Sequence, residues 1–229
     1  MKTIGLIGGM SWESSAEYYR IINQETARRL GGTHSARSLM LSVDFAEVEA
    51  AQHRGDWDAL EAEMVAAAQA LKAGGADFLV LCTNTMHRFA GAMEAGAGLP
   101  LLHIADPTAE AIRADGFTRV GLIGTAFTME QDFYKGRLTD RHGLDVLIPE
   151  AEDRALVHRI IYEELVLGIV REESRAAYAG VIARLIDRGA EAVILGCTEI
   201  MLLVRPEDSA VPLYDTTTLH ARAAVDRAL

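Results

Sequence analysis

Short apolar runs alternate along this chain with longer stretches of helical periodicity. The apolar runs predict strands at Ile4–Ile7, Leu39–Val43, Phe78–Leu81, Leu101–Ile104, Val120–Ile123, Val146–Ile148, Ala192–Leu195 and Leu213–Tyr214. The stretches between them predict helices near Glu13–Leu30, Trp57–Ala73, Pro107–Ala114, Met129–Arg141, Asp153–Leu167, Glu172–Arg188 and Leu219–Ala228. Because the strands are apolar throughout, we expect parallel sheets that are covered by helices on both faces.

The second half of the chain repeats features of the first half. Ile4-Gly5-Leu6-Ile7-Gly8 returns as Val120-Gly121-Leu122-Ile123-Gly124, and Leu99-Pro100-Leu101-Leu102 is echoed by Val211-Pro212-Leu213-Tyr214. Two further apolar runs end in Cys82-Thr83 and Cys197-Thr198. The fold class predicted is therefore α/β, with two similar domains that each hold a parallel sheet flanked by helices and are related by pseudo-twofold symmetry.

The boundary between the two domains carries no linker rich in Gly, Ser or Pro, so we expect the domains to share a tight interface. The last strand and the last helix are expected to return to the first domain. This gives a first domain of residues 1–105 plus 212–229 and a second domain of residues 106–211.

Composition narrows the class of partner. The chain has 229 residues, of which 50% are hydrophobic and 24% charged, and its net charge is −11. That charge argues against nucleic acid or an acidic membrane surface as a partner. No apolar run approaches the roughly 18 residues of a membrane span, and the start of the chain predicts a strand rather than a signal peptide. The expected location is cytoplasmic, where the two cysteines would stay reduced.

The two cysteines are the residues that point to chemistry. Ligands of open parallel sheets bind beyond the carboxyl ends of the strands, which is where Cys82 and Cys197 are expected. Both precede predicted helix starts, which lower a thiol pKa, so we expect partly ionised thiols. Two thiols facing one cleft could remove a proton from one side of a carbon and deliver one to the other side. Taken singly, each cysteine could equally be a small buried hydrophobe.

Other candidate sites are weaker. Thr83-Asn84-Thr85 and Thr198-Glu199 could cradle a carboxylate or simply cap helices. Gly5-Leu6-Ile7-Gly8-Gly9 has the wrong spacing for a dinucleotide fingerprint, so its glycines are interpreted as allowing close approach to a small ligand. Gln52-His53-Arg54 is expected in a polar loop near the cleft. His87 could tune Cys82 or act as a cap, and none of the seven histidines has metal-ligand spacing.

The two Cys-Thr motifs, together with Gly5-Leu6-Ile7-Gly8-Gly9-Met10-Ser11 at the start, resemble the aspartate/glutamate racemase family. Within it the chain looks closest to the broad-specificity amino-acid racemases of the aspartate-racemase branch. The resemblance implies a cofactor-independent racemase, often a homodimer, that acts on a small amino acid between two α/β domains. By matching of the motifs, the resemblance also implies that the two cysteines are the acid/base residues. It implies substrate contacts at Met10, Gln52, Thr83, Asn84, Thr85, Glu164, Thr198 and Glu199.

One departure from the family pattern concerns the substrate. Members restricted to aspartate or glutamate carry basic residues that hold the side-chain carboxylate, and the matching places here are Gln52 and Glu164. A neutral amide would not attract a second carboxylate, and an acid would repel one. Glu199 also stands where glutamate racemases have a histidine. The expected substrate range is therefore broad or non-acidic.

Two alternatives to a racemase stay open. The first is a cis–trans isomerase or decarboxylase of the same superfamily that acts on a dicarboxylate, with Cys82 as nucleophile and Cys197 as proton donor. The second is a non-catalytic protein that binds amino acids or senses redox state. A pyridoxal-phosphate enzyme is disfavoured, because the chain has only Lys2, Lys72 and Lys135 and none is expected in a pocket.

Overall fold

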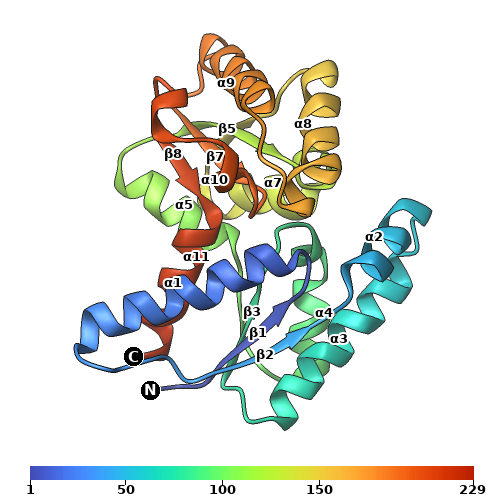
Figure 1. The fold of residues 1–229 in the computed structure, drawn as a ribbon, viewed down its shortest axis with the longest axis vertical. Helices are drawn as coiled ribbons and strands as arrows, with labels where there is room; N and C mark the ends of the chain where they lie inside the picture. The colour runs from blue at the N-terminus through green and yellow to red at the C-terminus, as the bar shows by residue number, and fades with distance from the viewer. The chain divides into compact units, whose positions relative to one another are not determined.

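The computed structural model describes all residues 1–229 and contains two four-stranded sheets (Figure 1). The first sheet has the order β2-β1-β3-β4 and the second the order β6-β5-β7-β8, and every strand pair is parallel. The two sheets therefore have the same strand order, with each strand number raised by four in the second sheet. The predicted α/β class with two similar sheets flanked by helices is confirmed. The strands are β1 (Ile4–Gly8), β2 (Ser38–Ser42), β3 (Phe78–Leu81), β4 (Leu101–Leu102), β5 (Arg119–Gly124), β6 (Asp145–Leu147), β7 (Ala192–Gly196) and β8 (Leu213–Asp215).

Helices connect successive strands, as parallel pairing requires. The α-helices are α1 (Trp12–Leu30), α2 (Phe45–Arg54), α3 (Trp57–Ala73), α4 (Ala90–Ala97), α5 (Ala105–Ala114), α6 (Ala126–Glu130), α7 (Asp132–Gly136), α8 (Ala151–Glu163), α9 (Glu172–Asp187), α10 (Ile200–Leu203) and α11 (Thr216–Ala228). Short 3₁₀ or π turns complete the chain: η1 (Thr85–Phe89), η2 (Arg137–Arg141), η3 (Leu165–Leu167) and η4 (Pro206–Asp208). None of these helices is long and apolar enough to cross a bilayer.

The chain divides into two compact units, Met1–His103 with His220–Leu229, and Ile104–Leu219. We expected all of residues 212–229 to return to the first unit. This expectation is wrong for the last strand, β8. Strand β8 pairs in register with β7 of the second sheet, with Ile194 opposite Tyr214. The hydrogen bonds of that pairing hold the segment in the second unit. Only the part of α11 that begins at His220 belongs to the first.

In the first unit, side chains of the central strands alternate between two apolar layers. Ile4 and Leu6 of β1 pack with α1 and α11, whereas Ile7 packs with α2, α3 and α4. Strand β3 follows the same alternation: Phe78 and Val80 face the α1 side, and Leu79 and Leu81 face the other. In the second unit one cluster surrounds β5 and β7, both of which are buried along almost their full length. Two-sided burial of this kind explains why the strands are apolar throughout.

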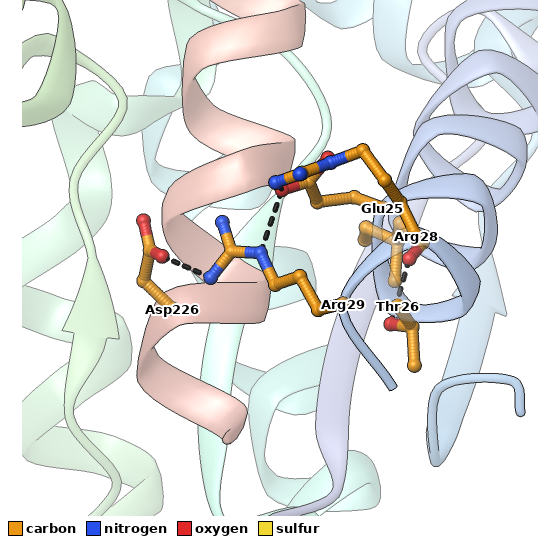
Figure 2. Close-up of polar contacts among 6 residues, drawn as sticks. Glu25, Thr26, Arg28, Arg29 and Asp226 are labelled. Atoms are coloured by element: carbon orange, nitrogen blue, oxygen red, sulfur yellow. Dashed lines mark hydrogen bonds and ion pairs between the residues drawn. The ribbon is translucent and has the colours of Figure 1, made fainter. Parts of the chain in front are cut away.

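A polar network joins α1 to α11 at the surface of the first unit (Figure 2). Glu25 of α1 accepts hydrogen bonds from Arg28 at 2.7 Å and from Arg29 at 2.6 Å, and Arg29 also pairs with Asp226 of α11. Hydrogen bonds from the two guanidinium groups lower the pKa of the buried Glu25 carboxyl to about 2. Arg29 thus links the two helices that cover one face of the sheet.

The ionised Glu25 carboxylate should make the stability of the protein depend on pH, and removal of its charge should abolish that contribution. The Glu25 pKa is depressed, so its contribution is present above the unfolded value near 4.5 and is lost as the pH falls through about 2. We expect Glu25→Gln to lower the free energy of unfolding at pH 7 by about 1 kcal/mol, because solvent screens the exposed Arg28. The difference in the free energy of unfolding between the variant and the parent, measured with urea, should become smaller below pH 4.5. Glu163→Gln, which breaks an exposed pair with Arg159, is the control and should change little. A constant difference from pH 7 to pH 2 would contradict the assignment.

The turn after β1 needs glycine for two reasons. Gly9 has φ of +95°, and a Cβ there would lie 2.2 Å from the Val43 carbonyl oxygen. Gly9→Ala should therefore destabilise the chain by at least about 2 kcal/mol in thermal or urea unfolding. Gly91→Ala in the exposed start of α4 is the matched control, since nothing lies within 4 Å of its added Cβ. That variant should be neutral or more stable by up to about 1 kcal/mol. Equal effects of the two changes would refute the steric explanation.

Candidate functional site

Cys82 is placed by the pairing of β3 with β1. It follows Leu81 directly, and its N–H donates to the Ile7 carbonyl at 2.9 Å, so it extends the strand by one residue. Its side chain is in phase with Phe78 and Val80 and lies in the apolar layer under α1 and α11. The thiol is fully buried, and this burial raises its pKa far above the ordinary value. Cys82 is therefore a protonated thiol at the carboxyl end of a central strand.

The expectation of partly ionised thiols is wrong for the resting protein. The turn that follows Cys82 is the short 3₁₀ segment η1, which begins only at Thr85, and the helix after Cys197 is the four-residue α10. Such short elements sum few peptide dipoles. Desolvation is the dominant influence on both thiols and favours the neutral form.

The residues after Cys82 form a buried polar turn. Thr83, Asn84 and Thr85 are each at most 9% exposed. The Thr83 carbonyl accepts a hydrogen bond from Nδ1 of His87 at 2.7 Å, and the Asn84 carbonyl accepts one from the His87 N–H at 3.1 Å. Asn84 precedes η1, yet its side chain makes no capping bond to it. The motif therefore does not act as an ordinary side-chain cap.

Gln52 and Met10 lie in the same unit as this turn. Gln52 is on α2, not in the polar loop that the sequence predicts, because Asp44 caps the start of that helix and Gly55 ends it in a left-handed conformation. The Gln52 side chain is buried, and its amide Nε2 lies 3.7 Å from Sδ of Met86 in η1. Met10 is buried in the turn that joins β1 to α1.

Cys197 occupies the equivalent place in the second unit but has a different partner. It follows Gly196, the last residue of β7, and its thiol Sγ donates to Oε2 of Glu199 at 2.9 Å. The Thr198 hydroxyl donates to the same oxygen at 3.0 Å. Burial, and then the charge and hydrogen bond of Glu199, raise the Cys197 pKa well above its ordinary value. The Glu199 carboxylate is therefore positioned to receive the Cys197 proton.

Glu164 is a second buried carboxylate in that unit. It follows α8, and its Oε2 accepts a 2.6 Å hydrogen bond from the Ser174 hydroxyl while Arg171 lies 3.5 Å from Oε1. Tyr178 of α9 shows that Glu164 shares an environment with the thiol. Burial raises the Tyr178 pKa well above its ordinary value, and interactions with Cys197, Glu164 and Glu199 raise it further. This half of the site is acidic.

The predicted residues divide between the two units in two groups. The first unit contains Met10, Gln52, Cys82, Thr83, Asn84 and Thr85, and the second contains Glu164, Cys197, Thr198 and Glu199. Sequence reasoning missed Ser174 and Tyr178, which surround the second group, and Ser14, whose hydroxyl lies 3.4 Å from the Cys82 carbonyl. All three lie in ordinary helical stretches, so periodicity gave no signal for them.

The fold and these two groups define the class of protein: a duplicated α/β protein with one buried thiol at the carboxyl edge of each parallel sheet. The chain belongs to the Asp/Glu/hydantoin racemase family, whose model matches residues 7–224. The family is one of racemases, which indicates a reaction of the isomerase type.

Three solved structures illustrate the similarity. A candidate Asp/Glu racemase from Yersinia pestis is 54% identical, with a TM-score of 0.92 over 100% of this chain and 99% of that chain. An aspartate racemase homologue from Pyrococcus horikoshii is 31% identical, with a TM-score of 0.83 and the same coverage. The aspartate racemase of Picrophilus torridus, 18% identical with a TM-score of 0.77 over 100% of this chain and 94% of that chain, shows the fold alone.

The partner of Cys197 can be tested through its reactivity. Glu199→Gln removes both the negative charge and the carboxylate acceptor, which raise the Cys197 pKa. We expect the pH midpoint for iodoacetamide alkylation of Cys197 to fall, because the thiolate is the reactive form. Cys82 is the internal control, since burial alone raises its pKa, and its midpoint should not move. Mass spectrometry of the two cysteine peptides gives both rates, and an unchanged Cys197 midpoint would mean that Glu199 has no influence on it.

Proposed function

We propose that this protein is a cofactor-independent amino-acid racemase in which Cys82 and Cys197 exchange protons with opposite faces of the substrate Cα. The observation that carries the proposal is the placement of one buried thiol directly after the equivalent strand of each sheet, β3 in one and β7 in the other. Two such thiols are the only cysteines of the chain. Membership of a racemase family supports the same reaction type.

The proposed reaction conserves protons and needs no other reactant. One cysteine, as thiolate, takes the proton from Cα and becomes a thiol. The other cysteine, as thiol, gives its proton to the opposite face of the same carbon and becomes the thiolate. The negative charge on the intermediate is delocalised into the substrate carboxylate, which N–H and hydroxyl donors near Thr83, Asn84 and Thr198 would stabilise. Each turnover leaves the protonation states of the two cysteines exchanged.

Both thiols have raised pKa values, so formation of the first thiolate needs an acceptor. Glu199 serves Cys197 in this role, because its Oε2 already accepts a hydrogen bond from Cys197 Sγ at 2.9 Å. Burial alone raises the Cys82 pKa, and a bound ammonium group would lower it by bringing a positive charge into a dry site. The two half-reactions therefore differ in how their thiolate arises, and the two directions of racemisation need not share one pH dependence.

The charges of the second unit support a preference for substrates without an acidic side chain. Glu164 is buried beside the Cys197 environment and carries a carboxylate, whereas Gln52 in the first unit offers only a neutral amide. A substrate carboxylate next to Glu164 would meet a like charge in a poorly solvated place. We therefore propose a broad range of neutral or basic amino acids.

Deuterium exchange at Cα tests the reaction directly. Cys82→Ser and Cys197→Ser should each lower racemisation by at least about 10³-fold, because a serine hydroxyl is too weak an acid to replace the thiol. Racemisation and Cα deuterium uptake would be measured by chiral chromatography and proton NMR in D₂O. Gly91→Ala, at an exposed position where an added Cβ meets nothing within 4 Å, is the control and should keep parental rates. Full activity in either serine variant would refute the two-cysteine scheme.

The substrates in that assay are L-methionine, L-lysine and L-aspartate. The proposed specificity predicts that L-methionine and L-lysine exchange faster than L-aspartate. Faster exchange of L-aspartate would contradict the proposed role of Glu164 and leave the cysteine mechanism intact. Release of CO₂ from an aryl or alkyl malonate with no exchange of any amino acid would instead favour the decarboxylase alternative.

A further inference from the structure

A buried histidine is hydrogen-bonded to the turn that follows Cys82. His87 is 2% exposed and its Nδ1 lies 2.7 Å from the Thr83 carbonyl oxygen, four residues earlier in the chain. A carbonyl oxygen can only accept, so this hydrogen bond requires the tautomer in which Nδ1 carries the hydrogen. The ring therefore holds the carbonyl of the residue next to the thiol.

The His87 ring is held in a neutral state by its surroundings. Burial, and then repulsion by the imidazoles of His103 and His220, lower the His87 pKa well below its ordinary value of 6.5. Hydrogen bonds with the carbonyls of Thr83 and Leu102 oppose that shift without overcoming it. Neutral His87 keeps a single N–H, and we assign it to Thr83 because the Leu102 carbonyl already accepts from Nε2 of His220 at 2.8 Å. The contact should therefore persist across the physiological pH range.

Two further imidazoles pack against that ring. His103 and His220 lie with ring centroids 4.6 Å and 5.7 Å from His87. His220 is itself tied at both nitrogens, since Nε2 donates to the Leu102 carbonyl at 2.8 Å and Nδ1 accepts from the Tyr18 hydroxyl at 2.8 Å. All these residues belong to the first unit. Such a fully packed imidazole is a rigid support for the turn.

The geometry of the peptide unit transmits this support to the turn. The bond between Thr83 and Asn84 is trans, so the Asn84 N–H points opposite to the Thr83 carbonyl. The Thr83 carbonyl points toward the ring of the buried His87. The Asn84 N–H is thereby directed away from His87. Because ligands bind beyond the carboxyl ends of the strands of an open parallel sheet, this N–H is a candidate donor to a ligand.

We propose that His87 is a positioning residue that orients the Thr83–Asn84 peptide, so that the Asn84 N–H donates to the substrate carboxylate as charge develops on it. The inference rests on the racemase function proposed above. Because it concerns a donor that acts most strongly in the transition state, the loss should appear in kcat more than in KM.

Two substitutions separate the hydrogen bond from the packing. His87→Phe keeps an aromatic ring but removes the donor, and we expect kcat to fall by about 10- to 100-fold with KM changed by less than about threefold. His87→Asn should recover most of the loss, because the amide nitrogen of Asn and Nδ1 of His are both bonded to Cγ and reach the same carbonyl. Exchange of L-methionine and L-lysine in D₂O is the assay. Parental kcat in a folded His87→Phe protein would overturn the proposal.

Tyr18→Phe is the matched control within the same cluster. It removes the hydrogen bond to His220 and leaves the His87–Thr83 contact in place, so stability should fall slightly while kcat stays within about twofold. An equal loss of kcat in Tyr18→Phe and His87→Phe would mean that general packing, not positioning, matters, and would overturn the inference.

A measurement on the unmodified protein needs neither a variant nor a substrate. Proton–nitrogen NMR of ¹⁵N-histidine-labelled protein should show His87 as the Nδ1–H tautomer and keep it neutral as the pH is lowered through 6.5. An Nε2–H tautomer would overturn the proposal. Failure of the racemase function itself is distinguishable, because the two serine variants would then keep full activity whatever His87 does.

Discussion

Two-sided burial of the central parallel strands is the constraint on which the rest of this structure depends. Strands β1 and β3 pair along their length in the first unit, and β5 and β7 do so in the second. A strand in this position has water on neither face, so every side chain must pack and every backbone group must pair. The chain changes direction only where the strands end. Polar and reactive side chains therefore gather at those ends.

The two strand ends each hold a buried cysteine, but the groups that surround the two thiols differ. Cys82 lies in an apolar layer and has its neighbouring carbonyl held by a neutral imidazole, whereas Cys197 donates a hydrogen bond to the carboxylate of Glu199. Burial favours the neutral thiol in both places. The carboxylates of Glu199 and Glu164 are tolerated in the interior because hydroxyl and thiol groups donate to them. The duplication thus preserves the backbone plan and lets the two sites differ in charge.

Sequence patterns predicted the strands well and the residues around the site unevenly. All eight strands were found within two residues at each end, because continuous apolar runs bounded by Gly, Asp or Pro carry a strong signal. Helix α2 was missed and Gln52 assigned to a loop, since its polar surface faces solvent and only Val48, Ala51 and Gln52 are buried. The single helix predicted over 129–141 is in fact α6, α7 and η2 in succession. The helices α4 and α10 are short and were likewise not predicted.

The sequence by itself determined the α/β class, the duplication, and the pair of Cys-Thr motifs at equivalent strand ends. These features follow from local periodicity and from repeated sequence motifs, which can be recognised without knowledge of distant contacts. Only the tertiary structure decided that β8 stays with the second sheet, that both thiols rest protonated, and that His87, His103 and His220 meet behind Thr83. The physical reason is that strand partnership, desolvation and side-chain contact depend on residues distant in the sequence, such as Ile194 and Tyr214, 20 positions apart, or Leu102 and His220, 118 positions apart, which no local pattern relates.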